Sequence, residues 1–429
     1  MQSRFNPPLL AVLAIAPVLS LALGAQAQKI PPGHAADAAQ WKAWRESMKQ
    51  TPVPSKGCFT ATYPSPEWRQ AACTVAPDVP LLPARGAAHI DTVGNTIDDT
   101  AYATSGVLSS AEGYFVTVSG LSSGNAYSLQ VNTNTFSTSA CSGAANPAAC
   151  WGWQQFVYES SGSVFMQYWL INYAEKCPSG WNTFTQYGPI YCWKNSSATG
   201  VSGEPVSELE YMSLTGKASG GTDTAIVNTG YGNVSAVGAD TVLNLEQSWN
   251  SAEFNIFGNG NGDQVNFNSG TTLVVQTAIN NGTTNAPVCR SLSYTAETNN
   301  LSLVGGCCPY GGTTPDIQFM ESNASGATAT CGTYGLQGNF TAEPYVTNVN
   351  VTVSGGPPFY INYSAELEDS TPGATIYYQP TVCGEPEGTQ SGYSGQYMDF
   401  EVENCSGVSG PIWATAPGYL PSGVGSFYL

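Results

Sequence analysis

Positive charge is scarce in this chain and almost disappears after Arg85. Charged residues make up 10% of the 429 residues, with 12 Lys and Arg against 30 Asp and Glu. Residues 86–429 contain four basic and 26 acidic side chains, whereas residues 1–85 contain eight basic and four acidic ones. We therefore expect no nucleic-acid partner, because the acidic body would repel a polyanion.

Histidine is nearly absent as well, with two residues in the whole chain. Past Arg85 a mechanism that needs a histidine base has one candidate, His89, and a multi-histidine zinc site has too few ligands. The sequence thus predicts no metal and no cofactor. What remains is carboxylate chemistry, or binding without chemistry.

Long apolar runs are missing except at the N-terminus. There Leu9–Leu23 follows Arg4 and precedes the small-x-small sequence Ala25–Ala27. This pattern is typical of a secretory signal peptide, and the run is short for a membrane span. We expect residues 1–27 to be removed and a monomeric chain to be exported, to the extracellular space or a periplasm, with no membrane contact.

Twelve cysteines in an exported chain indicate disulfides. Spacing predicts four local bridges: Cys58–Cys73, Cys141–Cys150, Cys177–Cys192 and Cys383–Cys405. The remaining four cysteines would pair among themselves, in a connectivity that spacing leaves open: Cys289, Cys307, Cys308 and Cys331. For the adjacent Cys307 and Cys308, we expect two separate bridges rather than one between neighbours.

The rest of the pattern predicts an all-β protein. Residues 86–340 contain a dozen or more short runs rich in Val, Phe, Tyr and Thr, separated by Gly, Asn and Ser turns, which favours an antiparallel two-sheet sandwich. Residues 28–85 form a basic leader whose one convincing helix is Asp37–Met48. This leader is either a propeptide that covers an acidic cleft or an N-terminal subdomain that stays attached.

Residues 341–429 read as a separate small β unit. The stretches Asp369–Tyr378 (DSTPGATIYY) and Ile412–Val424 (IWATAPGYLPSGV) resemble the immunoglobulin-like module appended to chitobiases and many secreted bacterial enzymes. In that family the module is accessory, so the resemblance implies a modular exported protein and no chemistry of its own.

Two strands carry polar residues where apolar ones are expected. In the run 162–173, period-2 alternation places Gln167 on one face with Trp169 and other aromatic side chains. In the run 249–258, Glu253 shares a face with Asn255. Burial of a carboxyl group without a cation should raise its pKa and make Glu253 a candidate general base or acid.

These strands resemble those of glutamic peptidases of the eqolisin type, over residues 86–280. Trp151–Tyr158 is similar to that family's tryptophan-led strand, Phe165–Tyr168 to its glutamine strand and Ser251–Phe254 to its glutamate strand. The spacing of 86 residues between Gln167 and Glu253 is similar too. The chain departs from the family in having Phe254 after the glutamate and Tyr-Trp after the glutamine.

The resemblance implies an acid endopeptidase with catalytic Glu253 and Gln167. Glu253 would take a proton from water and the Gln167 amide would stabilise the oxyanion. A polypeptide would be the substrate, with four residues as candidate substrate-binding positions: Trp153, Gln155, Trp169 and Asn255.

Other interpretations remain open. The aromatic content also suits a carbohydrate-binding sandwich without catalysis. Exposed tryptophans would favour this interpretation. A glycoside hydrolase would need Glu253 with a second carboxylate, Glu159 or Glu321. Gln167 and Glu253 on one concave face, a water apart, would favour a peptidase, and opposite faces would exclude it.

Overall fold

The computed structural model describes the sandwich and most strands of the C-terminal unit. Described are residues 31–33, 38–84, 92–95, 97–329, 331, 345–354, 360–368, 375–383, 385–386, 390–392, 396–403, 408–415 and 425–428. The predicted signal peptide, Asp37, His89 and Cys405 lie outside these ranges. No helix among the described residues is long and apolar enough to cross a membrane.

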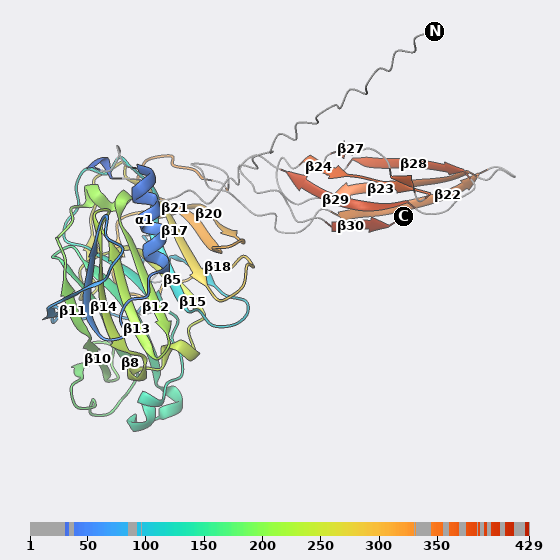
Figure 1. Cartoon of the computed structure of the whole chain (residues 1–429). Helices are drawn as coiled ribbons and strands as arrows, with labels where there is room; N and C mark the ends of the chain where they lie inside the picture. Colours follow the sequence, from blue (N-terminus) through green and yellow to red (C-terminus); the bar gives the residue numbers. More distant parts are fainter. Residues whose placement is uncertain are drawn as a thin grey trace, which may run out of the picture.

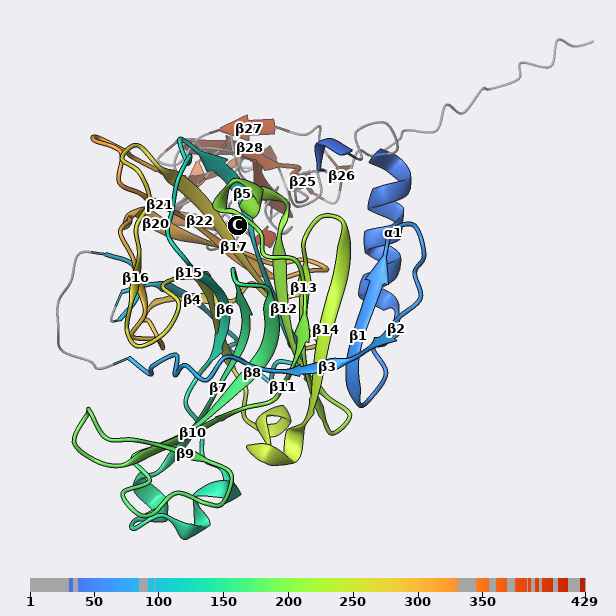
Figure 2. The same ribbon diagram turned by 90° about the vertical axis from the view of Figure 1, so that its left-hand side faces the viewer.

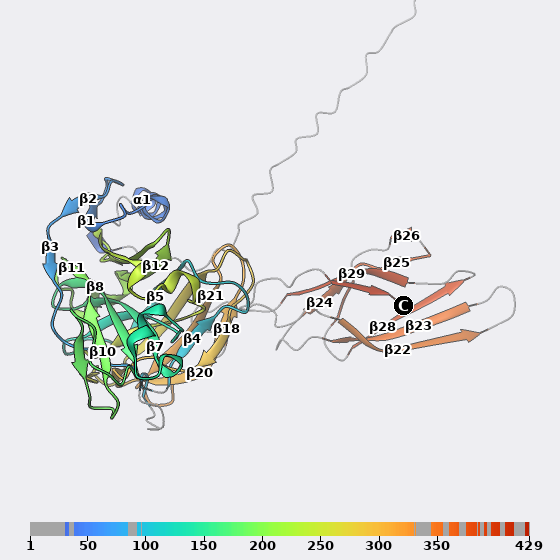
Figure 3. The same cartoon turned by 90° about the horizontal axis from the view of Figure 1, so that it is seen from below.

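Two large antiparallel sheets form the body, as Figures 1 and 3 show. Sheet A has nine strands in the order β2 (Arg69–Ala71), β1 (Gly57–Thr62), β14 (Gly232–Ala239), β13 (Thr222–Asn228), β12 (Ser213–Ser219), β5 (Ser110–Ser119), β17 (Thr272–Asn280), β21 (Asp316–Ser322) and β20 (Ser302–Tyr310).

Sheet B packs against sheet A. Its main path runs β18 (Val288–Ser291), β4 (Asp99–Tyr102), β15 (Ser251–Phe257), β6 (Ser128–Thr133), β7 (Trp151–Glu159), β8 (Ser163–Ile171), β10 (Tyr191–Asn195) and β9 (Asn182–Phe184). Strand β11 (Ser197–Gly200) pairs with β8 and with β3 (Cys73–Val75), and a short parallel pair joins β16 (Gln264–Val265) to β19 (Thr298–Asn299). Short 3-10 helices interrupt the loops: η2 (Ser139–Gly143), η3 (Pro147–Ala149), η4 (Val206–Tyr211), η5 (Asp240–Val242) and η6 (Leu245–Gln247).

The core fills the space between the two sheets. Phe115 of sheet A packs on Phe254 of sheet B, with ring centroids 5.4 Å apart. Gly113 and Gly216 of sheet A lie so close under Phe254 and Phe156 that a Cβ at either glycine would collide with the ring. These glycines let the two sheets approach. The prediction of an all-β antiparallel sandwich is confirmed.

Residues 38–84 contribute strands to both sheets of this body. The helix α1 (Ala38–Gln50) agrees closely with the predicted helix and lies beside sheet A in Figure 2. Strand β1 pairs with β14 over six residues, and β3 pairs with β11 of sheet B. No strand was predicted in this leader, which therefore contains more than a helix and a loop.

The predicted local disulfides among described cysteines are present: Cys58–Cys73, Cys141–Cys150 and Cys177–Cys192. The open connectivity is Cys289–Cys307 with Cys308–Cys331, so the two adjacent cysteines belong to separate bridges. The predicted Cys383–Cys405 bridge involves a residue outside the described part of the chain.

The C-terminal strands enclose a small core of their own, which includes Ala365, Ile376 and Ile412. One sheet has the order β22 (Tyr345–Ser354), β23 (Tyr360–Glu368) and β28 (Tyr397–Glu403). The other has the order β26 (Glu385–Pro386), β25 (Thr381–Val382), β29 (Val408–Thr415), β24 (Thr375–Tyr378) and β27 (Gln390–Gly392), with β30 (Gly425–Tyr428) on β29.

Candidate functional site

A row of four polar side chains crosses sheet B. Gln167 of β8 is in register with Gln155 of β7, Gln155 with Asn132 of β6, and Asn132 with Glu253 of β15. Residues paired in register point to the same side of a sheet. Gln167 and Glu253 therefore share one face, and all four side chains are fully buried.

The two candidate catalytic residues are not a water apart. Two strands separate β8 from β15, so on a flat sheet their Cα atoms would be roughly 14 Å apart at the usual strand spacing. Gln167 and Glu253 therefore lie on one face, as the peptidase interpretation requires, but they are farther apart than it requires. Gln155 and Asn132 fill the interval.

The other predicted binding residues lie on this same face. Alternation along β7 puts Trp153 beside Gln155, and along β8 it puts Trp169 beside Gln167. On β15, Asn255 is two residues from Glu253. All six candidates come together on one side of sheet B, and none is exposed to solvent.

An extended segment covers half of this face. We call residues 76–84 the strap; it follows β3 and crosses in front of β8 and β7 in Figure 2. Gln167 Nε2 donates to the Val79 carbonyl at 3.0 Å, and Gln167 Oε1 accepts the Leu81 N–H at 2.7 Å. On the neighbouring strand β10, Asn195 Nδ2 donates to the Pro77 carbonyl at 2.8 Å.

Gln167 is fully engaged in this arrangement. Its Nε2 also donates to Asn195 Oδ1 at 2.8 Å, and its Oε1 also accepts from Trp169 Nε1 at 3.0 Å. The four bonds satisfy the amide and fix its orientation.

The far half of the strap is held by a carboxyl group that the sequence analysis missed. Glu297 Oε1 accepts the Leu82 N–H at 2.8 Å and the Gly262 N–H at 3.1 Å, while the Thr295 hydroxyl donates to Glu297 Oε2. The Ala296 N–H donates to the Leu82 carbonyl at 2.8 Å. Burial raises the pKa of Glu297 to about 7, although these donors oppose the shift.

Glu253 lies under the loop that follows β18. Its Oε2 accepts from Asn132 Nδ2 at 2.8 Å and from the Tyr294 N–H at 3.1 Å. Burial raises the pKa of Glu253 to about 7, and hydrogen bonds from Ser293 and Asn132 partly offset the shift. Within the part of the chain that the structure describes, no hydrogen bond joins Glu253 to the strap or to Gln167.

Two further carboxyl groups lie near Glu253 in the interior. Asp98 lies close enough to Glu253 for the two carboxyl groups to affect one another, and Glu253 contributes to the raised pKa of Asp98. Asn255 Nδ2 lies 3.3 Å from both Asp98 oxygens and 3.3 Å from Glu321 Oε2, which also accepts from Asn299 Nδ2 at 3.0 Å. We call Asp98, Glu253 and Glu321 the carboxyl cluster.

The carboxyl cluster is built for protonated side chains. Burial raises the pKa of Glu321 to about 8. Burial and the neighbouring Glu253 and Glu321 raise the pKa of Asp98 well above its ordinary value. Among the described residues, amide groups and not cations hydrogen-bond these acids, so the cluster is accommodated mainly by keeping it neutral.

Three acceptors in the polar row have no hydrogen-bond partner among the described residues: Asn132 Oδ1, Gln155 Oε1 and Glu253 Oε1. The first two belong to the side chains between Gln167 and Glu253. An unsatisfied buried acceptor costs about 1–3 kcal/mol, so this part of the face retains capacity to bind a donor.

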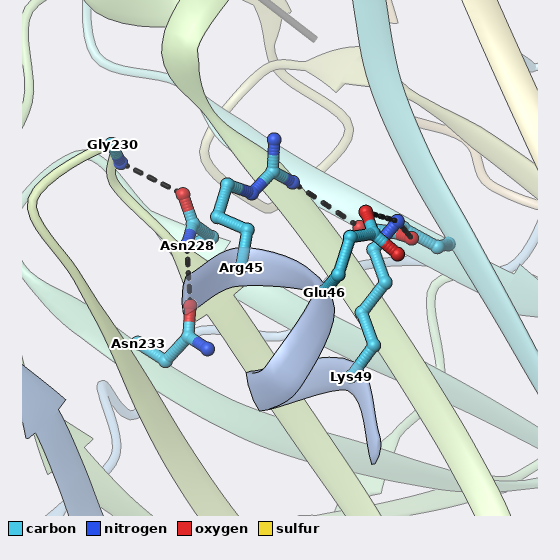
Figure 4. Close-up of polar contacts among 7 residues, drawn as sticks. Arg45, Glu46, Lys49, Asn228, Gly230 and Asn233 are labelled. Carbon is cyan, nitrogen blue, oxygen red and sulfur yellow. Dashed lines mark hydrogen bonds and ion pairs between the residues drawn. The ribbon is translucent and has the colours of Figure 1, made fainter. Parts of the chain in front are cut away.

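The outer face of sheet A carries a different kind of contact, shown in Figure 4. Arg45 of α1 lies 3.7 Å from Glu112 of β5, and Lys49 lies 3.6 Å from the other Glu112 oxygen. A pocket of about 360 Å³ opens beside α1, lined by these residues and by Lys217. It lies on the opposite side of the sandwich from the polar row.

Within the described ranges, no group of three His, Cys, Asp or Glu is arranged to hold a metal ion. Comparison with known proteins finds no matching family model, no matching curated protein and no matching solved structure. The site therefore rests on its own geometry.

Proposed function

We propose that this chain is an exported acid endopeptidase with Glu253 as general base and Gln167 as oxyanion stabiliser. The observation that carries the proposal is the polar row, which puts both residues on one buried face of sheet B. A segment of polypeptide already lies across that face and is bound through its main chain by Gln167.

The proposed reaction needs no group beyond water. Glu253 takes a proton from a water molecule, and the resulting hydroxide adds to the carbonyl carbon of the scissile peptide. The Gln167 N–H donates to the oxyanion. This step requires Gln167 and Glu253 to approach one another, because Gln155 and Asn132 lie between them in the covered form. The protonated Glu253 then gives its proton to the leaving nitrogen as the C–N bond breaks.

The covered form would be inactive for two physical reasons. The Gln167 amide is occupied by the strap. With a pKa of about 7, Glu253 is protonated in acid and cannot act as a base. Burial is the largest cause of that shift, and the loop that follows β18 covers Glu253. Ionisation of Glu253 at lower pH would therefore require that loop to open, in addition to departure of the strap. The leader would then act as an inhibitory propeptide.

Burial of the tryptophans supports a peptidase over the carbohydrate-binding alternative. Trp153 and Trp169 are fully buried and Trp193 is 6% exposed, while Trp151 is 41% exposed. A carbohydrate-binding surface needs several exposed aromatic rings for stacking on sugars, and of these four tryptophans only Trp151 is exposed. The five disulfides among described residues suit an exported protein.

The test begins with full-length protein purified at pH 7 and shifted to about pH 3–4. We expect loss of the leader and cleavage of casein. Glu253→Gln should lower the cleavage rate by about 10²–10⁴-fold and Gln167→Ala by about 10²–10³-fold. The measurement is casein hydrolysis together with the N-terminal sequence of the product.

Matched controls exist on sheet A. Asp316 is buried with a pKa raised by burial to about 7, and Gln276 is a buried glutamine that accepts from Gln318. Asp316→Asn and Gln276→Ala should retain activity. No cleavage at any pH, or full activity in Glu253→Gln, would refute the proposal.

A further inference from the structure

The strap buries two adjacent leucines on the covered face. Leu81 is 0% and Leu82 is 2% exposed. They belong to two different apolar clusters. Leu81 is grouped with Val157, Phe165 and Ala198, and Leu82 with Trp153, Trp169 and Trp193.

The two clusters lie on opposite sides of the polar row. Along β7 the residues on this face run Trp153, Gln155, Val157, and along β8 they run Trp169, Gln167, Phe165. The Gln155–Gln167 pair is therefore the boundary between the two clusters. The peptide unit that joins Leu81 to Leu82 spans this boundary.

Main-chain contacts hold the strap on both sides of the boundary. Gln167 binds the Leu81 N–H and Glu297 binds the Leu82 N–H. The Asn261 N–H donates to the Pro80 carbonyl at 2.8 Å, and Ala84 N–H donates to the Tyr294 carbonyl at 2.9 Å. Such bonds do not depend on side-chain identity, so selection falls to the two apolar clusters.

We propose that the face under the strap selects extended peptides with two adjacent large apolar residues, one on each side of the Gln155–Gln167 pair, and that Leu81 and Leu82 imitate such a substrate. The assignment of this face as a substrate site rests on the proposed function. An acidic residue at either position would be excluded, because it would bury a charge among the apolar side chains of the two clusters.

Binding is measured in the full chain carrying Glu253→Gln, so that turnover does not consume the probe. The probe is a fluorescein-labelled synthetic peptide with the sequence of residues 76–84, followed by anisotropy. Adding Leu82→Asp unseats the strap and should tighten probe binding at least about tenfold relative to Glu253→Gln alone. A probe with serine in place of both leucines should bind at least about tenfold more weakly.

The matched control is Val75→Asp, because Val75 precedes the strap and is 92% exposed. It should bind the probe no better than Glu253→Gln alone. If Leu82→Asp does not fold, Leu82→Ala replaces it. This variant should also bind the probe more tightly than Glu253→Gln alone, by a smaller factor. Equal binding of the two probes, or no binding of either to a folded variant, overturns the proposal. Because Glu253→Gln is used throughout, failure of casein cleavage would count against the catalytic proposal and leave this result standing.

Discussion

Residues 38–84 are held on two faces of the sandwich by different forces. On the outer face of sheet A, Arg45 and Lys49 of α1 pair with Glu112. On the covered face of sheet B, the strap is bound by the Gln167 amide, by Glu297 and by apolar burial of its leucines. One contact depends on opposite charges, and the other on neutral hydrogen bonds and packing.

The two faces should respond to pH in opposite directions. Burial would raise the pKa of Glu112, but Lys49 and Arg45 hold it below its ordinary value. At and near the covered face, burial raises the pKa values of Glu253 and Glu297 to about 7 and that of Glu321 to about 8. Acid therefore favours these neutral buried acids and weakens the ion pair between α1 and sheet A.

The largest expected effect is on the pH dependence of the whole fold. The folded state keeps protons on Glu253, Glu297 and Glu321 that the unfolded chain loses above about pH 4.5. The stability these groups contribute is complete below that pH and is lost as pH rises towards 8. Each pKa unit is worth about 1.4 kcal/mol, so the free energy of unfolding should fall by several kcal/mol.

Guanidinium unfolding at about pH 4.5, 6 and 8 measures this slope. A denaturation midpoint that stays constant, or rises with pH, would mean that the buried acids are not protonated in the folded protein. The contrast between the two faces would then disappear.

A single substitution isolates the contribution of the carboxyl cluster to the pH dependence of the free energy of unfolding. Glu321→Gln keeps a side-chain oxygen for the Asn255 and Asn299 amides but cannot ionise. It should raise the free energy of unfolding by about 1–3 kcal/mol at pH 8 and change it little at pH 4.5. The control is Glu46→Gln on α1, whose side chain is 71% exposed and should leave the pH slope unchanged. Destabilisation of Glu321→Gln at pH 8 would contradict the account.

Local patterns were enough to predict which strand faces carry the candidate site. Period-2 alternation placed Gln167 with Trp169 and Glu253 with Asn255, and both pairs lie on the covered face. The row itself could not be predicted, because it depends on which strands are neighbours. Asn132 joins Glu253 across 121 residues of sequence. No local signal specifies that β6 separates β7 from β15.

The polar environment of the buried acids also could not be predicted from the sequence. A carboxyl group among apolar residues indicated a shifted pKa, but not how the fold accommodates it. Asn132, Asn255 and Asn299 supply the donors, and they come from three separate strands. Glu297 was missed because it is an acid in a loop with no strand pattern around it. The proline-rich strap read as a linker, although its two leucines were a signal for burial.

The smallest expected effect tests the ion pair between α1 and sheet A. Glu112→Gln should lower the free energy of unfolding by about 1–2 kcal/mol at pH 7, because the contacts are 3.6–3.7 Å long and Lys49 is 43% exposed. A carboxyl group with a lowered pKa contributes its stability above the unfolded value and loses it as pH falls through the folded value. The variant should therefore match the parent at pH 3, both in unfolding and in hydrogen exchange of the α1 amides. Glu46→Gln, which removes an exposed partner 3.5 Å from Lys49, should cost no more than a few tenths of a kcal/mol. An equal loss at pH 3 and pH 7 would show that Glu112 holds α1 by packing, and the two faces would then differ in their apolar contacts alone.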